Sequence, residues 1–312
     1  MSVEQHTSGA AVRAGSPAAW LVAVRPRTLL VAISPVLVGA ALGWQRTGAL
    51  DLTVSLIVLA AALLMQVLSN LQNDVGYTVR GGESSGTRTG LPRATARGWL
   101  TVRTVRNAIV LGALVSVALG MLLVLHRGWP VLAIGLASLL AALAYMGGPR
   151  PIAYTPYGEL TVFVFFGLVA VTGTDWMLTQ SVGAATVVAA VALGALAAAA
   201  LAVNNHRDIA HDALVGRRTF AVTFGAAASR RLYSLLLLGS FALTPLMAWL
   251  AGSALLLLPC LLLPAAWTLR HDMHRCPPGI AFNEVLFRTF RMELAYAVLL
   301  ACGAVLGRLW GW

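Results

Sequence analysis

The chain alternates long apolar runs with short polar segments. Nine of these runs have the length of a membrane helix, which needs about 20 mainly apolar residues. In lipid such runs must be helical, because an unpaired backbone amide finds no hydrogen-bond partner there. The pattern therefore predicts an all-α integral membrane protein, a bundle of nine transmembrane helices. The predicted helices cover about residues 27–44, 53–72, 104–125, 129–146, 159–179, 184–204, 232–251, 253–269 and 292–310.

The composition agrees with a membrane protein. Only 11% of the 312 residues are charged and 59% are hydrophobic, whereas a soluble domain has about 25% charged residues. No polar linker divides the apolar runs, so residues 19–312 are expected to form a single membrane domain. The small and polar residues 1–18 are expected to form a disordered tail. The alanine-rich run 184–204 is expected near the centre of the bundle, because small residues let helices approach closely.

The positive charge is carried by arginine alone. The net charge is +11, and all 22 basic residues are arginines. With nine spans, 19 of the 22 lie on the same side as the N-terminus. Cytoplasmic loops carry the excess of basic residues, so the N-terminus is predicted in the cytoplasm. No nucleic-acid-binding motif accompanies the charge, which indicates arginines that flank membrane helices or bind phosphate rather than nucleic acid.

Two polar segments follow apolar runs on this predicted cytoplasmic side. The first polar segment, residues 70–97, contains Asn70, Asn73, Asp74, Glu83, Arg88 and Arg93. The second polar segment, residues 204–219, contains Asn204, Asn205, Arg207, Asp208, Asp212, Arg217 and Arg218. The two are alike in design, although they are too different to be identified as a sequence repeat.

Asp208 and Asp212 lie four residues apart, which on a helix places both carboxylates on one face. Carboxylates, water and substrate phosphate are the ligands that Mg²⁺ prefers, and Arg217 and Arg218 can donate forked hydrogen bonds to phosphate. The pattern predicts a metal-bridged diphosphate at the membrane surface. The alternatives are a solvated loop with ordinary ion pairs, or the ion pathway of a transporter.

A third polar segment, residues 145–159, is rich in glycine, proline and tyrosine. Tyr145 and Tyr154 are candidates to stack on an aromatic substrate or to shield a carbocation with their ring faces. The alternative for each is anchoring at the membrane interface. Arg25 opens the first predicted helix, where it either binds phosphate or anchors the helix end.

Motifs along most of the chain resemble the UbiA superfamily of intramembrane prenyltransferases, in particular its 1,4-dihydroxy-2-naphthoate polyprenyltransferase branch. The matching stretches are Arg25-Pro-Arg-Thr28, Pro35-Val-Leu-Val-Gly39, Asn70-Leu-Gln-Asn-Asp74, Gly147-Gly-Pro-Arg-Pro-Ile-Ala-Tyr154, residues 158–174, and Asn204-Asn-His-Arg-Asp208 continuing through Asp212 to Gly216-Arg-Arg-Thr219.

The resemblance implies nine helices around a central cavity, with two aspartate-rich motifs facing each other at its cytoplasmic mouth. It further implies a Mg²⁺-dependent transfer of a polyprenyl group from prenyl diphosphate to an aromatic quinone precursor, in a bacterial-type inner membrane. Arg207, Arg217 and Arg218 would neutralise phosphate charge. The residues expected to bind metal and diphosphate are Asn70, Asn73, Asp74, Asn205, Asp208 and Asp212.

The chain departs from the family pattern at Tyr77, where the first motif normally has its second aspartate. Either Glu83 or water would then complete the metal shell, or this side of the mouth handles the metal differently. The alternative functions are a family member with another acceptor, such as 4-hydroxybenzoate, a terpene cyclase, and a membrane transporter without chemistry.

Overall fold

The computed structural model of the chain describes residues 12–82, 89–276 and 279–311. Within these ranges every regular element is a helix. Eight helical units have the length and hydropathy of a membrane span. A ninth apolar helix, Pro130–Met146, is slightly shorter. The nine predicted spans fall on these nine units, so the predicted fold class is confirmed for the described residues.

The first four spans are built from five helices and one 3₁₀ turn. They are α1 (Pro17–Val24), η1 (Pro26–Leu29), α2 (Leu30–Thr47), α3 (Leu52–Val79), α4 (Val102–Arg127) and α5 (Pro130–Met146).

The remaining five spans contain several interrupted helices. Their elements, with the connecting helices, are η2 (Ile152–Tyr154), α6 (Gly158–Val162), η3 (Phe163–Val169), α7 (Ala170–Thr179), α8 (Ala184–Arg207), α9 (Ile209–Leu214), α10 (Phe220–Ala242), α11 (Thr244–Ala251), η4 (Ala254–Leu262), α12 (Leu263–Arg275) and α13 (Phe282–Trp310).

Several helices extend beyond the apolar runs that predicted them. α3 continues to Val79, seven residues past the predicted end, so Asn73, Asp74 and Tyr77 lie on a helix. α13 begins ten residues earlier than expected, at Phe282. Hydropathy marks the part of a helix that faces lipid, whereas these extensions pack against other parts of the protein and can therefore carry polar residues.

The N-terminal end of the chain is helical from Pro17. Ser16 caps α1, because its hydroxyl accepts a hydrogen bond from the Ala19 amide. Residues 1–11 of the expected tail lie outside the described residues. α1 thus begins two residues before the expected boundary of the membrane domain.

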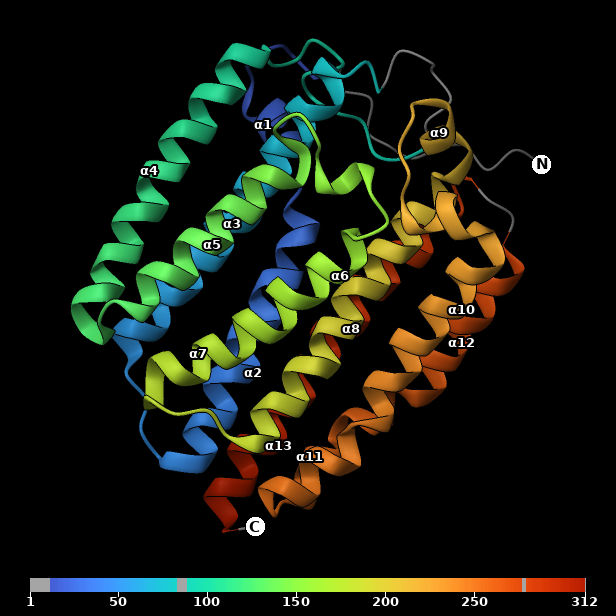
Figure 1. The fold of residues 1–312 in the computed structure, drawn as a ribbon. Coiled ribbons are helices and arrows are strands. Elements are labelled where there is room, and N and C mark those ends of the chain that lie inside the picture. The colour runs from blue at the N-terminus through green and yellow to red at the C-terminus, as the bar shows by residue number, and fades with distance from the viewer. Residues whose placement is uncertain (1–11, 83–88, 277–278, 312) are drawn as a thin grey trace.

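α8 lies at the centre of the bundle, as its alanine content predicts (Figure 1). It packs against α10, α13 and the π-helical segment η3. A Cβ atom on Gly167 of η3 would meet the Cα atom of Gly194 of α8 at 2.5 Å. The backbones of the two helices therefore touch directly, with no room for a side chain between them.

α5 and the α6–η3–α7 span are held mainly by different neighbours. α5 packs on α3 and α4, whereas α7 packs mostly on α2 and α8 and makes a smaller contact with α3. The ribbons of α5 and α7 are separated in Figure 1. A cavity with walls from both sides occupies this region.

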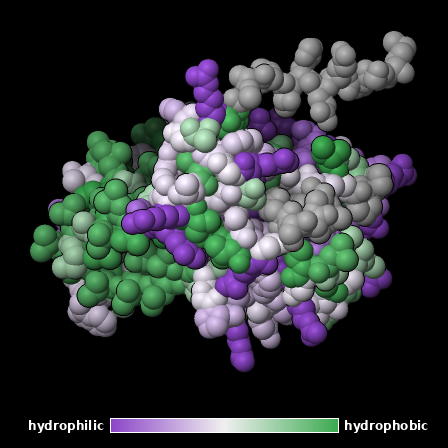
Figure 2. All heavy atoms as spheres, turned by 90° about the horizontal axis from the view of Figure 1, so that it is seen from above, coloured by the Kyte–Doolittle hydropathy of each residue, from purple (hydrophilic) through white to green (hydrophobic). Residues whose placement is uncertain are grey.

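The polar segments gather at one end of the bundle, where α1 and α9 lie in Figure 1, and the C-terminus lies at the opposite end. Figure 2 looks onto this end, where hydrophilic side chains protrude around a paler centre and hydrophobic side chains cover one flank. α1 and the end of α13 lie at opposite ends of the bundle, which agrees with an odd number of spans. Which end faces the cytoplasm stays a prediction.

Candidate active site

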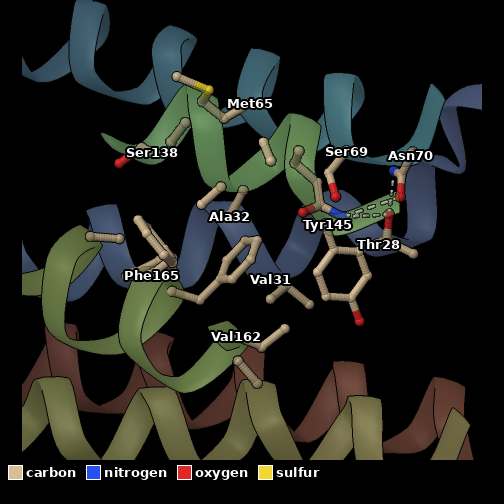
Figure 3. Close-up of a pocket in the computed structure, with 18 of the residues that line it drawn as sticks. Thr28, Val31, Ala32, Met65, Ser69, Asn70, Ser138, Tyr145, Val162 and Phe165 are labelled. Carbon is tan, nitrogen blue, oxygen red and sulfur yellow. Dashed lines mark hydrogen bonds between the residues drawn. The ribbon is translucent and has the colours of Figure 1, made fainter. Parts of the chain in front are cut away.

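The cavity has a volume of about 800 Å³, which is within the usual range of about 300–1,000 Å³ for small-molecule sites. It extends from the end that carries the polar segments deep into the bundle. Its apolar part includes Val31, Ala32, Met65 and Phe165, whose side chains converge in Figure 3. Its polar end is lined by Arg25, Arg27, Asn70, Asn73, Tyr77, Arg93, Asn204, Arg207 and Arg217.

Asn70 joins α3 to the start of the first span. Its amide nitrogen donates hydrogen bonds to the Val24 carbonyl at 2.7 Å and to the Thr28 hydroxyl at 2.8 Å. Figure 3 shows Asn70 and Thr28 side by side at the polar end, with Tyr145 close to them. Arg25, which precedes this contact, has a left-handed backbone with φ 55°, a conformation that few residues other than glycine adopt.

Asp74 is turned away from the cavity and into its own polar segment. Its carboxylate accepts hydrogen bonds from the Ala94 amide at 2.9 Å and the Thr95 amide at 2.8 Å. The Thr95 hydroxyl donates a third bond. The side chain is fully buried and does not line the cavity. Asp74 thus fixes residues 93–95 beside α3, and this holds Arg93 at the cavity wall.

Asp208 and Asp212 of the second polar segment are both paired with arginines. Arg207 binds both oxygens of Asp208, at 2.9 Å and 2.6 Å, and also donates to the amide oxygens of Asn204 and Asn283. Asp212 accepts from Arg217 at 2.6 Å. Bidentate and charge-assisted bonds of this kind are short and strong, so they place Arg207 and Arg217 firmly at the cavity wall.

Tyr77 connects the two polar segments. Its hydroxyl accepts a hydrogen bond from Arg217. The guanidinium carbon of Arg93 lies 3.6 Å from the ring centre, and that of Arg217 lies 4.9 Å from it. Arg93 also donates to the Asn73 carbonyl at 3.0 Å. Burial lowers the pKa of Arg217 to about 9, so this side chain stays positively charged at neutral pH.

The two tyrosines predicted as catalytic differ in position. Tyr145 lines the cavity, within electrostatic reach of Glu159 and Asp212. Tyr154 packs beside Tyr77 and is not among the cavity-lining residues. Burial raises the pKa of the Tyr154 phenol, and nearby Arg80 acts in the opposite direction.

A buried polar pair lies behind the second polar segment. The amide nitrogen of Asn205 donates to a Glu159 carboxylate oxygen at 2.9 Å. Among the described residues, the other Glu159 oxygen and the Asn205 amide oxygen have no hydrogen-bond partner. Unsatisfied buried oxygens are costly, and they are suitable ligands for a hard cation.

The donor set of the second polar segment fits a magnesium ion. Asp208 and Asp212 supply carboxylates, and Asn205 supplies a buried amide oxygen without a partner. Like Asp74, these three residues are buried behind the cavity wall and are not among the cavity-lining residues. Within the described ranges no group of three or more histidine, cysteine, aspartate or glutamate side chains surrounds one point. A metal ion here would therefore complete its shell with amide, phosphate and water oxygens, as Mg²⁺ commonly does.

Several predicted site residues lie outside the cavity lining or outside the described residues. Arg218 is exposed and lies outside the cavity lining, although its backbone amide binds the Tyr154 carbonyl. Asn205 is buried behind the cavity wall. Glu83 and Arg88 lie outside the described residues. The contacts of Thr95 with Asp74 and of Asn283 with Arg207 were not predicted, because a lone threonine or asparagine in the sequence gives no signal for such contacts.

The UbiA prenyltransferase family matches residues 32–277, which is well over half of the chain and includes both polar segments. This chain belongs to that family. The sequence expectation of a UbiA-type prenyltransferase is thus confirmed, and the long apolar helices make it an integral membrane protein.

Curated UbiA relatives match over most of their length. The 1,4-dihydroxy-2-naphthoate octaprenyltransferase of Escherichia coli (strain K12) is 34% identical over 305 residues, which cover 93% of this chain and 96% of the relative. The 1,4-dihydroxy-2-naphthoate octaprenyltransferase of Mycobacterium tuberculosis is 36% identical over 228 residues, which cover 70% and 74%.

Solved UbiA structures share the fold. A UbiA homolog from Aeropyrum pernix K1 superposes with a TM-score of 0.67 at 16% identity, covering 89% of this chain and 97% of that one. A UbiA homolog from Archaeoglobus fulgidus bound to GPP and Mg²⁺ gives a TM-score of 0.62 at 16% identity, covering 90% and 99%.

Proposed function

We propose that this UbiA enzyme transfers a polyprenyl group from prenyl diphosphate to 1,4-dihydroxy-2-naphthoate, in a Mg²⁺-dependent step of menaquinone-type biosynthesis. One observation carries the proposal: a mouth lined with arginines leads directly into a long apolar cavity. A prenyl diphosphate has the matching form, an anionic end joined to an apolar tail. The acceptor is inferred from relatives named as naphthoate octaprenyltransferases.

The diphosphate lies at the polar end in this proposal. Arg207 and Arg217 are held at the wall by Asp208 and Asp212, and they offset the negative charge that grows on the leaving diphosphate. Charge stabilisers that are already in position make a large contribution to catalysis. Asp208, Asp212 and Asn205 are the residues suited to hold Mg²⁺, which would supply further electrophilic stabilisation of the diphosphate.

The prenyl tail lies in the apolar part of the cavity, among Met65, Phe165 and neighbouring aliphatic side chains. The allylic carbon–oxygen bond breaks, and its electron pair leaves with the diphosphate. The ring carbon that bears the acceptor carboxylate then attacks the allylic carbon, and the carboxylate departs as CO₂. The surrounding apolar wall excludes water from the cationic carbon.

Tyr145 is placed to act on the acceptor. It lines the cavity at the junction of its polar and apolar parts, where an aromatic acceptor must approach the allylic carbon. Its ring can stack on the acceptor or face the developing cation. The mouth faces the cytoplasm in this proposal, because the predicted spans assign 19 of the 22 arginines to the side of the N-terminus, and cytoplasmic loops carry the excess of basic residues.

The test uses membranes that contain the protein, a polyprenyl diphosphate and a panel of acceptors, with products identified by mass. We expect a prenylated naphthol without the carboxyl group, with diphosphate released in equal amount and only when Mg²⁺ is present. If 4-hydroxybenzoate were the only acceptor that gave a prenylated product, the proposed acceptor would be wrong and the prenyltransferase activity would stand. Absence of both product and diphosphate release with every acceptor would refute the enzymatic proposal and favour a transporter.

A further inference from the structure

Tyr77 occupies the point where the two polar segments meet. Its side chain is buried, and it lines the polar end of the cavity. One arginine from each segment contacts it: Arg93 lies against the ring face, and Arg217 donates to the hydroxyl. A single phenol thus holds two guanidinium groups beside the place proposed for the diphosphate.

The contacts of Arg93 and Arg217 fix their orientation. Arg93 is held on one side by the ring and by the Asn73 carbonyl. Arg217 is held by the Tyr77 hydroxyl, the Asp212 carboxylate and the Ala153 carbonyl. Long arginine side chains lose conformational entropy when they bind a ligand, and side chains that are already ordered avoid that cost.

The described residues of the first polar segment bring no carboxylate to the cavity wall. The Asp74 carboxylate accepts three hydrogen bonds from residues 94 and 95 and does not reach the cavity. Tyr77 carries a phenol rather than a carboxylate, the group that Mg²⁺ prefers. The described residues of this segment that line the cavity are Asn70, Asn73, Tyr77, Leu91, Pro92 and Arg93.

We propose that Tyr77 is a positioning residue that holds Arg93 and Arg217 for direct contact with the diphosphate, so that the described residues of this half of the mouth bind the anion without a metal ion. The inference rests on the proposed function, because it takes the diphosphate to lie at the mouth. Among the described residues, the candidate metal ligands are then those of the second polar segment. Arginine suits this task, since its planar group donates to two phosphate oxygens at once.

The test measures binding of inorganic pyrophosphate to the purified protein in detergent, in EDTA and in Mg²⁺. The wild-type protein is expected to keep measurable affinity in EDTA. Tyr77→Leu removes both contacts and is expected to weaken this metal-free binding at least tenfold. Tyr77→Phe keeps the ring against Arg93 but loses the bond from Arg217, and its affinity should lie between the two.

Tyr77→Asp is expected to make pyrophosphate binding more dependent on Mg²⁺. A carboxylate at this position repels the anion when no metal is present, but it can bind Mg²⁺. The gain in pyrophosphate affinity on adding Mg²⁺ should therefore be larger for Tyr77→Asp than for the wild-type protein. In transfer assays, Tyr77→Leu should raise the KM for prenyl diphosphate and leave the KM for the acceptor unchanged.

Tyr233→Phe is the matched control. Tyr233 is also fully buried and bonds Thr289 through its hydroxyl, but it lies outside the cavity. Loss of the Tyr233 hydroxyl should leave the affinity for pyrophosphate the same as in the wild-type protein. If Tyr77→Leu does not fold, Tyr77→Phe still carries the test, because it preserves the ring.

Two outcomes overturn the inference: wild-type binding that vanishes in EDTA, or Tyr77→Phe and Tyr77→Leu that bind as the wild type does in EDTA. The result is independent of the acceptor. Metal-free pyrophosphate binding without transfer to any acceptor would leave the inference standing and refute the proposed function. If the protein transferred the prenyl group but bound pyrophosphate only in the presence of Mg²⁺, the proposed function would stand and the inference about Tyr77 would be refuted.

Discussion

The two polar segments look alike in sequence and differ in how the structure uses their carboxylates. Each follows a long apolar helix and begins with asparagines and aspartates. In the first, Asp74 turns inward and binds backbone amides of its own segment. In the second, Asp208 and Asp212 bind arginines that line the cavity. The first carboxylate organises structure, whereas the second pair orients charge at the site.

This difference shows that the role of a carboxylate depends more on the groups that it binds than on its position in a sequence motif. Backbone amides that bind Asp74 cannot move without unfolding the segment. The arginines that bind Asp208 and Asp212 face an open cavity, where a diphosphate can share them. A like pattern of residues in the two segments therefore need not mean that both bind metal in the same way.

The largest expected effect comes from the second polar segment. Asp208→Ala or Asp212→Ala removes a candidate metal ligand and the partner of an arginine at the wall. We expect the rate of prenyl transfer to fall by about 10²–10³ or more, the usual cost of losing one oriented charge stabiliser. The assay is the initial rate of product formation at saturating Mg²⁺. Full activity in both variants would show that Asp208 and Asp212 are not the Mg²⁺ ligands.

Asp175→Ala is the control for these two changes. Asp175 is equally buried but lies on α7, near the opposite end of the bundle, where it accepts hydrogen bonds from Arg46, Thr186 and the Gly183 amide. Its loss should lower the thermal unfolding temperature and leave the rate per folded molecule close to that of the wild type.

Asp74→Ala should act first on stability. The change leaves the Ala94 and Thr95 amides without their partner, and hydrogen bonds to a charged group contribute about 1.5–3 kcal/mol each. The thermal unfolding temperature in detergent should show a clear fall. A smaller fall is expected for Thr95→Val, which removes the hydroxyl contacts with Asp74 and Thr78 but keeps both amide bonds to the Asp74 carboxylate. A variant as stable as the wild type but as inactive as Asp208→Ala would abolish the contrast between the two segments.

The smallest expected effect tests the apolar part of the cavity. Gly135 of α5 lines it, and a Cβ atom there meets nothing within 4 Å. Gly135→Phe should therefore fold normally and narrow the space for the tail. We expect a several-fold lower kcat/KM for a long polyprenyl diphosphate and little change for dimethylallyl diphosphate.

Gly239→Phe is the matched change elsewhere. Gly239 of α10 is also a helical glycine with open space around its Cβ position, but it does not line the cavity. With Gly239→Phe, the kcat/KM for the long polyprenyl diphosphate and for dimethylallyl diphosphate should be the same as with the wild-type protein. Equal losses with long and short donors in Gly135→Phe would argue against a tail bound along this wall.

The sequence predicted the features that lipid imposes. Nine apolar runs, the central place of the alanine-rich α8 and the clustering of polar segments at one end all follow from hydropathy and residue size. Arg207 and Arg217 were also predicted at the site, because phosphate needs such groups.

The direction of individual side chains could not be predicted in this way. Asp74 points away from the cavity because Ala94 and Thr95, 20 residues further along the chain, supply its partners. The stacking of Arg93 and Arg217 on Tyr77 brings together residues up to 140 positions apart. Such contacts depend on how the segments fold over one another, which residue spacing alone does not reveal.

The contact between Gly167 and Gly194 gives the cavity two unlike walls. Where η3 meets α8, main-chain atoms set the separation, so exchanging side chains elsewhere leaves that distance alone. Across the cavity, α5 packs on α3 and α4. Its main chain approaches that of α3 at its last residue, Met146, beside Gly76, whereas Gly135 within the helix has open space around its Cβ position. One wall thus serves as a fixed reference, and sequence change can reshape the opposite wall to suit different occupants without disturbing the first.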